Sequence, residues 1–279
     1  MSTPIEPAAN LSPSPARGQQ WPLIAPEEPP PFRIVNEEGD APFLLVCDHA
    51  SRRIPASLQG LGLAEQILQR HVACDIGAEQ VTLALAQRFN APAVLASYSR
   101  LIVDLNRQLH DDSAFARESD GIPIPGNSNL SASDRQARIE SFFEPYHAAV
   151  HAQLQRFTVR GQVPALLSIH SFTPAMNGFQ RPWHIGIMWD KDPRIAQPLI
   201  ARLSAQDGVC VGDNEPYSGA HLNDYTVDVH AEQQGFPCVG VEFRQDLVAT
   251  TTLAQNWAQR FGDAIAPILE DPQLYERRA

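Results

Sequence analysis

Two short runs in this sequence are apolar at nearly every position, residues 42–47 and residues 165–169. A strand that is buried on one face alternates apolar and polar side chains, so a continuous apolar run predicts a strand buried on both faces. Such strands belong to mostly parallel sheets, which carry helices on both sides. This pattern constrains the fold more than any other feature of the chain.

Strands and helices are predicted to alternate along the remaining sequence. Helical spacing of apolar residues predicts helices over residues 63–72, 76–89, 134–160, 193–203 and 254–269, and shorter runs predict strands over 93–97, 101–105, 184–189, 209–211, 226–229 and 239–243. We therefore expect an α/β fold with helices on both faces of a mostly parallel sheet. The polar stretch 111–129 is longer than most unstructured loops, about 12–15 residues, which favours a functional role.

The N-terminal segment differs in composition from the rest. Residues 1–32 hold nine of the 24 prolines, and such a segment cannot bury enough apolar surface to offset the entropy of ordering. We expect it to be largely disordered or draped over the surface. Residues 33–279 are predicted to form a single domain, within the size range of α/β folds.

Charge and composition exclude several classes of protein. The formal net charge of −11 argues against a nucleic-acid partner, which requires a basic surface. No apolar stretch approaches the roughly 18 residues of a membrane span, and no signal peptide is visible. The four cysteines form no C-x-x-C pair, which indicates a reducing compartment without disulfides. We predict a cytoplasmic monomer or small homo-oligomer.

Polar residues at the ends of predicted strands carry the chemistry, because ligands of open α/β sheets bind there. His49 and His170 each follow a buried strand, and neutral imidazole is a common metal ligand. Two histidines with one carboxylate are a frequent set for catalytic zinc. Asp75 is the preferred third ligand and Asp48 the alternative. Other divalent ions also accept these ligands.

Two further groups suit substrate binding and proton transfer. Asn106 and Arg107, with Arg100 before them, could bind a carboxylate, because a guanidinium matches it with two hydrogen bonds; the alternative is a structural pair with Asp104. Glu242 interrupts an apolar strand, where burial would raise its pKa and suit a general base. The alternative for Glu242 is an ion pair with Arg244 or another arginine.

The chain resembles the N-formylglutamate amidohydrolase family in six stretches that occur in order. They are VCDHAS (46–51), CDIGA (74–78), SRLIVDLNR (99–107), SIHSFTP (168–174), NEPY (214–217) and VEFRQDL (241–247). The DLNR run is also similar to the carboxylate-binding stretch of the aspartoacylase and zinc carboxypeptidase superfamily. One residue departs from the carboxypeptidase pattern: Arg52 stands where a metal-binding glutamate would follow the first histidine, which supports Asp75 as the ligand.

The resemblance implies a three-layer α/β/α sandwich with a mixed sheet, of the phosphorylase/hydrolase-like zinc exopeptidase type. It also implies zinc-dependent hydrolysis of an N-acyl acidic amino acid such as N-formyl-L-glutamate, with Glu242 as general base. We add Ser171, Tyr217 and Arg244 to the expected substrate-binding residues. The alternatives are a metallopeptidase or amidase acting on a short peptide or cell-wall fragment, and a non-catalytic carboxylate-binding protein on the same fold.

Overall fold

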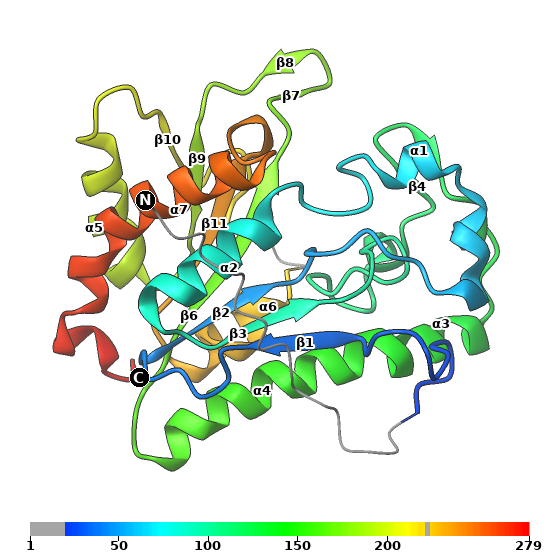
Figure 1. Cartoon of the computed structure of the whole chain (residues 1–279), viewed down its shortest axis with the longest axis horizontal. Helices are drawn as coiled ribbons and strands as arrows, with labels where there is room; N and C mark the ends of the chain where they lie inside the picture. The colour runs from blue at the N-terminus through cyan, green and yellow to red at the C-terminus, as the bar shows by residue number, and fades with distance from the viewer. Residues whose placement is uncertain (1–19, 221–223, 279) are drawn as a thin grey trace, which may run out of the picture.

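Seven strands form one sheet at the centre of the computed structural model, which describes residues 20–220 and 224–278 (Figure 1). Their order across the sheet is β1-β3-β2-β6-β11-β9-β10. The strands are β1 (Phe32–Val35), β2 (Phe43–Cys47), β3 (Ala93–Ala96), β6 (Ala165–Phe172), β9 (Ile185–Met188), β10 (Val211–Asp213) and β11 (Cys238–Arg244).

The sheet is mixed but mostly parallel. Strands β3, β2, β6 and β11 run in one direction, and each pairs in parallel with its neighbour. Strand β1 is antiparallel to β3, β9 is antiparallel to β11, and β10 is parallel to β9. Because the four central strands are parallel, their carboxyl ends meet at one edge of the sheet.

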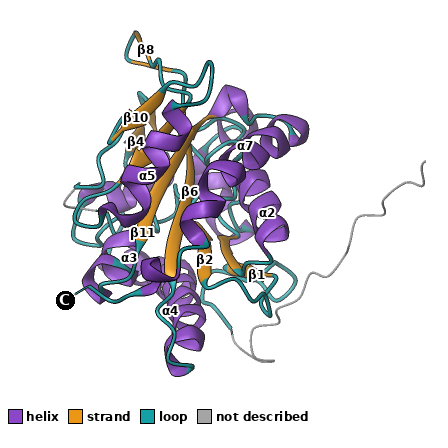
Figure 2. Ribbon diagram, turned by 90° about the vertical axis from the view of Figure 1, so that its left-hand side faces the viewer, coloured by secondary structure: helices purple, strands orange, loops and turns teal. Residues whose placement is uncertain are grey.

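Helices cover both faces of this sheet. Helices α2 (Ala78–Phe89), α5 (Pro193–Ser204) and α7 (Thr251–Leu269) pack against one another and one face. Helices α4 (Glu144–Val159) and α6 (Thr226–His230) cover the opposite face. Figures 1 and 2 show the strands between the two helical layers. The predicted α/β/α sandwich with a mixed, mostly parallel sheet is confirmed.

The apolar runs fill two separate hydrophobic clusters. In β6, Leu167 and Ile169 join the cluster under α2, α5 and α7, whereas Leu166 joins the cluster under α4. Successive side chains of a strand point to opposite faces, so both clusters draw on the same strand. Each fully buried leucine or isoleucine contributes about 1.5–3 kcal/mol, which explains why β2 is apolar throughout and why β6 is apolar until Ser168.

The helical segment predicted over residues 134–160 is present, with a distortion. It consists of α3 (Ala132–Arg138), the π-helix η4 (Ile139–Phe143) and α4. A capping box begins it: the Ser131 hydroxyl accepts from the Asp134 amide at 3.1 Å, and the Asp134 carboxylate accepts from the Ser131 amide at 3.0 Å. The two reciprocal bonds satisfy amides that have no partner inside the helix.

Two predicted strands are wrong. Residues 101–105 form no strand, and their carbonyls are bound by side chains instead: Leu101 O accepts from Asn127 and Ile102 O from Arg138. Residues 226–229 form helix α6 rather than a strand. In both cases β-branched residues suggested a strand, but tertiary contacts decided the backbone conformation.

The smaller elements lie mostly in the connections. The helix predicted over residues 63–72 is only one turn long, α1 (Glu65–Leu68). The others are β4 (Glu118–Ser119), β5 (Ile122–Pro123), β7 (Ala175–Met176), β8 (Phe179–Gln180), and the 3-10 helices η1 (Ala56–Gly62), η2 (Asp112–Phe115), η3 (Pro125–Asn127), η5 (Glu232–Gln234), η6 (Gln245–Leu247) and η7 (Pro272–Tyr275).

The part of the N-terminal segment that is described lies against the domain. The Leu23 amide donates to the Ser141 hydroxyl at 3.1 Å, and Leu23 and Ile24 pack against the apolar cluster under α4. Residues 1–19 lie outside the described residues, so the boundary at residue 32 stays a prediction. Within residues 20–220 and 224–278, no helix combines the length and apolar character needed to cross a bilayer.

Gly77, at the start of α2, offers a test of how tightly this helix is seated. Its φ of 84° is unfavourable for other residues, and a Cβ would lie 2.2 Å from the Val248 carbonyl oxygen. Gly161 has a similar φ of 76° but open space around it. We expect Gly161→Ala to lower the free energy of unfolding by about 1–2 kcal/mol, and Gly77→Ala by clearly more, because overpacking adds about 1–3 kcal/mol. Thermal unfolding of both variants checks this, and equal losses would contradict the close packing.

Candidate metal centre

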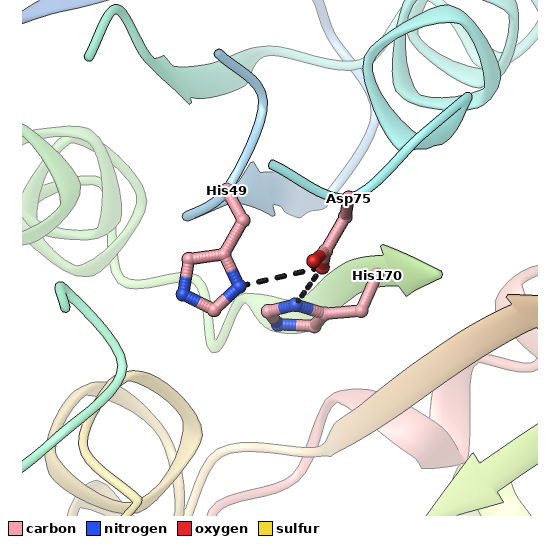
Figure 3. A group of neighbouring side chains, drawn as sticks. All are labelled: His49, Asp75 and His170. Carbon is pink, nitrogen blue, oxygen red and sulfur yellow. Dashed lines mark hydrogen bonds and ion pairs between the residues drawn. The ribbon is translucent and has the colours of Figure 1, made fainter. Parts of the chain in front are cut away.

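Three side chains from separate elements converge at the carboxyl edge of the sheet. His49 follows β2, His170 lies in β6, and Asp75 precedes α2. The Nδ1 atoms of His170 and His49 lie 2.8 and 3.3 Å from the same oxygen of Asp75, Oδ2 (Figure 3). One ligand atom from each residue lies within 4.8 Å of the other two. All three side chains are buried, and their arrangement could hold one metal ion.

The second ring nitrogen of each histidine, Nε2, has a partner other than Asp75. His49 Nε2 donates to Asp104 Oδ1 at 2.7 Å, and His170 Nε2 lies 2.9 Å from the Ser168 hydroxyl and 3.5 Å from Asp48 Oδ2. Imidazoles that bind metals usually carry such an outer partner, which orients the ring. Asp48, the alternative third ligand, therefore lies behind the His170 ring and not with the other ligand atoms.

The electrostatics of the centre favour a positive charge. Burial acts to raise the pKa of Asp75, but the imidazoles of His49 and His170 outweigh burial and hold this pKa well below its ordinary value. Burial acts to lower the pKa of His170, but Asp48 and Asp75 outweigh it and raise the pKa. Asp75 is thus an ionised carboxylate that needs cationic partners, either protonated imidazoles or a bound cation.

Glu242 faces the same centre from the neighbouring strand. Because β11 pairs with β6 in parallel, with Glu242 opposite His170, both side chains point to the same face of the sheet. Burial raises the pKa of Glu242 to about 7, and Asp75 adds to this effect. Its Oε2 atom is buried and has no hydrogen-bond partner among the described residues. The alternative ion pair with Arg244 is not formed, because Arg244 pairs with Asp246 at 2.8 Å.

A cleft of about 470 Å³ opens above these residues, within the usual range of small-molecule sites. Every residue that the sequence suggested for the site lines it, except Arg244 and the alternative metal ligand Asp48. The lining consists of His49, Asp75, Arg100, Asn106, Arg107, His170, Ser171, Met188, Pro216, Tyr217, Ser218, Asp224 and Glu242.

Arg100 connects two carboxylates of the centre. Its Nη2 and Nε atoms donate to Asp104 Oδ2 at 2.6 and 3.0 Å, and Nη1 lies 3.4 Å from Asp75 Oδ1. Asp104 in turn accepts from His49. Arg100 therefore fixes Asp75 and, through Asp104, the partner of the His49 imidazole, while part of its guanidinium lines the cleft.

Asn106 and Arg107 form hydrogen bonds with residues at the start of α6. Asn106 Oδ1 accepts from the amides of Tyr225 and Thr226 at 3.2 and 3.0 Å. Arg107 Nη1 donates to the Asp224 carboxylate and to Asn106 O. Asp224, rather than Asp104, is thus the carboxylate that contacts Arg107. No sequence motif distinguishes Asp224, which lies 117 residues further along the chain in a polar stretch.

Tyr217 and Ser171 complete the walls of the cleft. The Tyr217 hydroxyl accepts from Arg181 Nη2 at 3.3 Å, and the Arg181 guanidinium also lies over the Tyr217 ring. Arg181 is buried and was not predicted as a site residue. The Ser171 hydroxyl donates to Ile76 O at 2.8 Å, so it holds the segment beside Asp75.

Comparison with known proteins shows the family that this chain matches. The family model of N-formylglutamate amidohydrolase matches residues 41–249. The gene product Atu2144 from Agrobacterium tumefaciens has a crystal structure that aligns over 89% of this chain and all of its own, with 32% identity and a TM-score of 0.84.

A second solved structure supports the fold alone. It is the N-formylglutamate amidohydrolase from Ralstonia eutropha JMP134, which aligns over 84% of this chain and 99% of its own with 20% identity and a TM-score of 0.51. No curated protein matches the chain. The family match spans β2 to β11 and contains the three converging residues, Glu242 and both cleft arginines, and on this basis the chain belongs to the N-formylglutamate amidohydrolase family.

Proposed function

We propose that this protein hydrolyses the amide bond of an N-acyl acidic amino acid, with N-formyl-L-glutamate as the first candidate substrate. The observation that carries the proposal is the convergence of His49, Asp75 and His170 in a cleft that also holds a buried glutamate and two arginines. Membership of the family supports the reaction class. The reaction consumes water and gives a carboxylic acid, here formate, and the free amino acid.

The donor set fits a divalent metal ion, and zinc is our first choice. Two imidazole nitrogens and one carboxylate oxygen face a common point, which matches the ligand types of catalytic zinc sites. The outer nitrogens of both rings are already bound, so the free positions point inward. When bound, such an ion supplies Lewis-acid chemistry at the amide carbonyl and lowers the pKa of water.

Glu242 is placed to move the proton in this reaction. The attacking water must lose a proton as its oxygen bonds to the acyl carbon, and the departing nitrogen must gain one as the C–N bond breaks. Glu242 Oε2 has no partner among the described residues, and a carboxyl with a pKa of about 7 can both accept and return a proton near neutral pH. We assign it as the general base and then the general acid.

Arg107 and Asn106, with Arg100 and Tyr217, form the proposed carboxylate-binding wall. Only Nη1 of Arg107 bonds to other described residues, so further donors of its guanidinium can reach a substrate carboxylate. Arg244 lies outside the cleft lining and pairs with Asp246. We therefore do not assign Arg244 to this wall, and its substitution serves as the control for Arg107.

The proposed activity is tested with purified protein, N-formyl-L-glutamate and a formate assay. We expect turnover in the wild type and loss of both turnover and bound metal in His170→Ala, because one of three ligands is gone. His151→Ala, which alters an exposed histidine of α4, should retain both. Metal content is measured by elemental analysis. Full activity in the His170→Ala variant or in chelated protein would refute a metal-dependent mechanism.

Glu242→Gln separates proton transfer from metal binding. Glutamine keeps the shape of the side chain but cannot accept the proton. We expect kcat to fall by about 100- to 10,000-fold, the usual contribution of a general acid–base residue, with metal content unchanged. A variant that retains at least a tenth of the wild-type kcat would remove Glu242 from this role.

Arg107→Ala tests the carboxylate-binding wall. Loss of a charge-assisted hydrogen bond costs about 1.5–3 kcal/mol, so KM for N-formyl-L-glutamate should rise roughly 10- to 100-fold. Arg244→Ala removes an arginine that pairs with Asp246 outside the cleft, and its KM should stay within about twofold of wild type. Equal effects of the two substitutions on KM would count against a specific role for Arg107.

A further inference from the structure

The segment that carries Asn106 and Arg107 takes no part in the sheet. Residues 101–107, here named the clamp segment, end with Asn106 and Arg107 and form neither strand nor helix. Side chains bind its backbone carbonyls instead. Leu101 O accepts from Asn127 at 2.9 Å, Ile102 O from Arg138 at 2.8 Å, and Leu105 O from His147 Nε2 at 2.9 Å.

His147 is the support nearest to the substrate-binding residues. It lies on α4, is buried, and bonds to the carbonyl that directly precedes Asn106. Because Leu105 O can only accept, Nε2 of His147 carries a proton, and in a neutral ring Nδ1 is then an acceptor. His230 Nε2 lies 3.0 Å from that Nδ1 and donates to it, with the two rings stacked.

The pair is therefore held in one arrangement of protons, with both rings neutral. Burial lowers the pKa of His147 to about 3 and that of His230 to about 4, in agreement with this arrangement. The Tyr225 ring packs on His147 with 4.4 Å between ring centroids, and the ring of Phe143, four residues earlier in the chain, packs on it at 4.3 Å. The imidazole of His147 has little room to turn.

Helix α6 connects the same residues by a second route. Its first turn is bound by Asn106 Oδ1, which accepts from the amides of Tyr225 and Thr226. Its last residue is His230, which supports His147. The clamp segment, α4 and α6 thus form a closed chain of hydrogen bonds, and a shift of Leu105 would move Asn106 away from α6.

We propose that His147, supported by His230, is a positioning residue that sets the orientation of Asn106 and Arg107 toward the substrate carboxylate. This inference rests on the proposed function of that wall. Loss of the bond leaves a buried carbonyl without a partner, at a cost of about 1–3 kcal/mol, and the clamp segment can reduce this cost only by moving. Displacement of Asn106 and Arg107 then weakens binding of the substrate carboxylate, which raises KM.

The kinetic test compares two substitutions of His147. His147→Phe fills the same space without a donor, whereas the amide of His147→Gln can still donate to Leu105 O. We expect KM for N-formyl-L-glutamate to rise about 10-fold in the phenylalanine variant, with kcat within about threefold of wild type and metal content unchanged. The glutamine variant should restore KM to within about threefold. His151→Phe, an exposed position on the same helix, should leave KM unchanged.

A double variant then links the effect to Arg107. If His147 acts through the clamp, His147→Phe combined with Arg107→Ala should bind substrate no more weakly than Arg107→Ala alone. Effects on KM that add fully in the double variant, or a fall in kcat with KM unchanged, would overturn the positioning role. If His147→Phe does not fold, His230→Leu removes only the support at Nδ1 and should give a smaller rise in KM of the same kind; no rise there overturns the proposal.

Hydrogen exchange measured by mass spectrometry tests the same claim without activity. Peptides that cover residues 101–107 should exchange faster in His147→Phe than in wild type, while peptides of β11 remain unchanged and His147→Gln matches wild type. Unchanged exchange in residues 101–107 would refute the inference. If wild type fails to hydrolyse N-formyl-L-glutamate but the exchange differs as expected, the proposed substrate is wrong and the structural role of His147 stands.

Discussion

The carboxylate of Asp75 is the interaction on which the site depends. One of its oxygens receives the imidazoles of His49 and His170, and the other faces Arg100. These partners come from the end of β2, from β6 and from the loop before the clamp segment. Removal of one partner from a buried ionic group typically costs about 3–5 kcal/mol. The contacts that gather the candidate metal ligands therefore also join three parts of the fold.

Much of the architecture could be predicted because the sheet is buried on both faces. Residues 42–47 and 165–169 are apolar at nearly every position, and β2 and β6 lie there as expected. The placement of His170 and Glu242 follows from the same logic. Once two parallel strands pair with these residues opposite each other, their side chains must share a face. Local pattern and strand geometry together were sufficient for this half of the site.

The other half depends on contacts that no local pattern records. Residues 101–105 have the composition of a strand, but side chains from Asn127, Arg138 and His147 satisfy their carbonyls. Residues 226–229 also have β-branched character, yet an amide side chain 120 residues earlier caps them as a helix. Asp224 and Arg181 could not be predicted from the sequence for the same reason. Their roles depend on partners that are distant in sequence, and a single sequence does not identify such partners before the fold is known.

The π-helix η4 determines the relative direction of two side chains on the long helical segment. Arg138 lies just before η4 and His147 just after it, and both bind carbonyls of one short stretch, Ile102 and Leu105. Nine residues of regular α-helix turn through about two and a half revolutions, which would direct the two side chains to opposite sides. The wider turn of η4 reduces that divergence. The extra residue of the π turn thus keeps Arg138 and His147 from facing opposite sides of the helix. Substitutions that restore a regular α-helical turn at unchanged length should therefore separate the two contacts, whereas loss of one residue from η4 should preserve their relative direction.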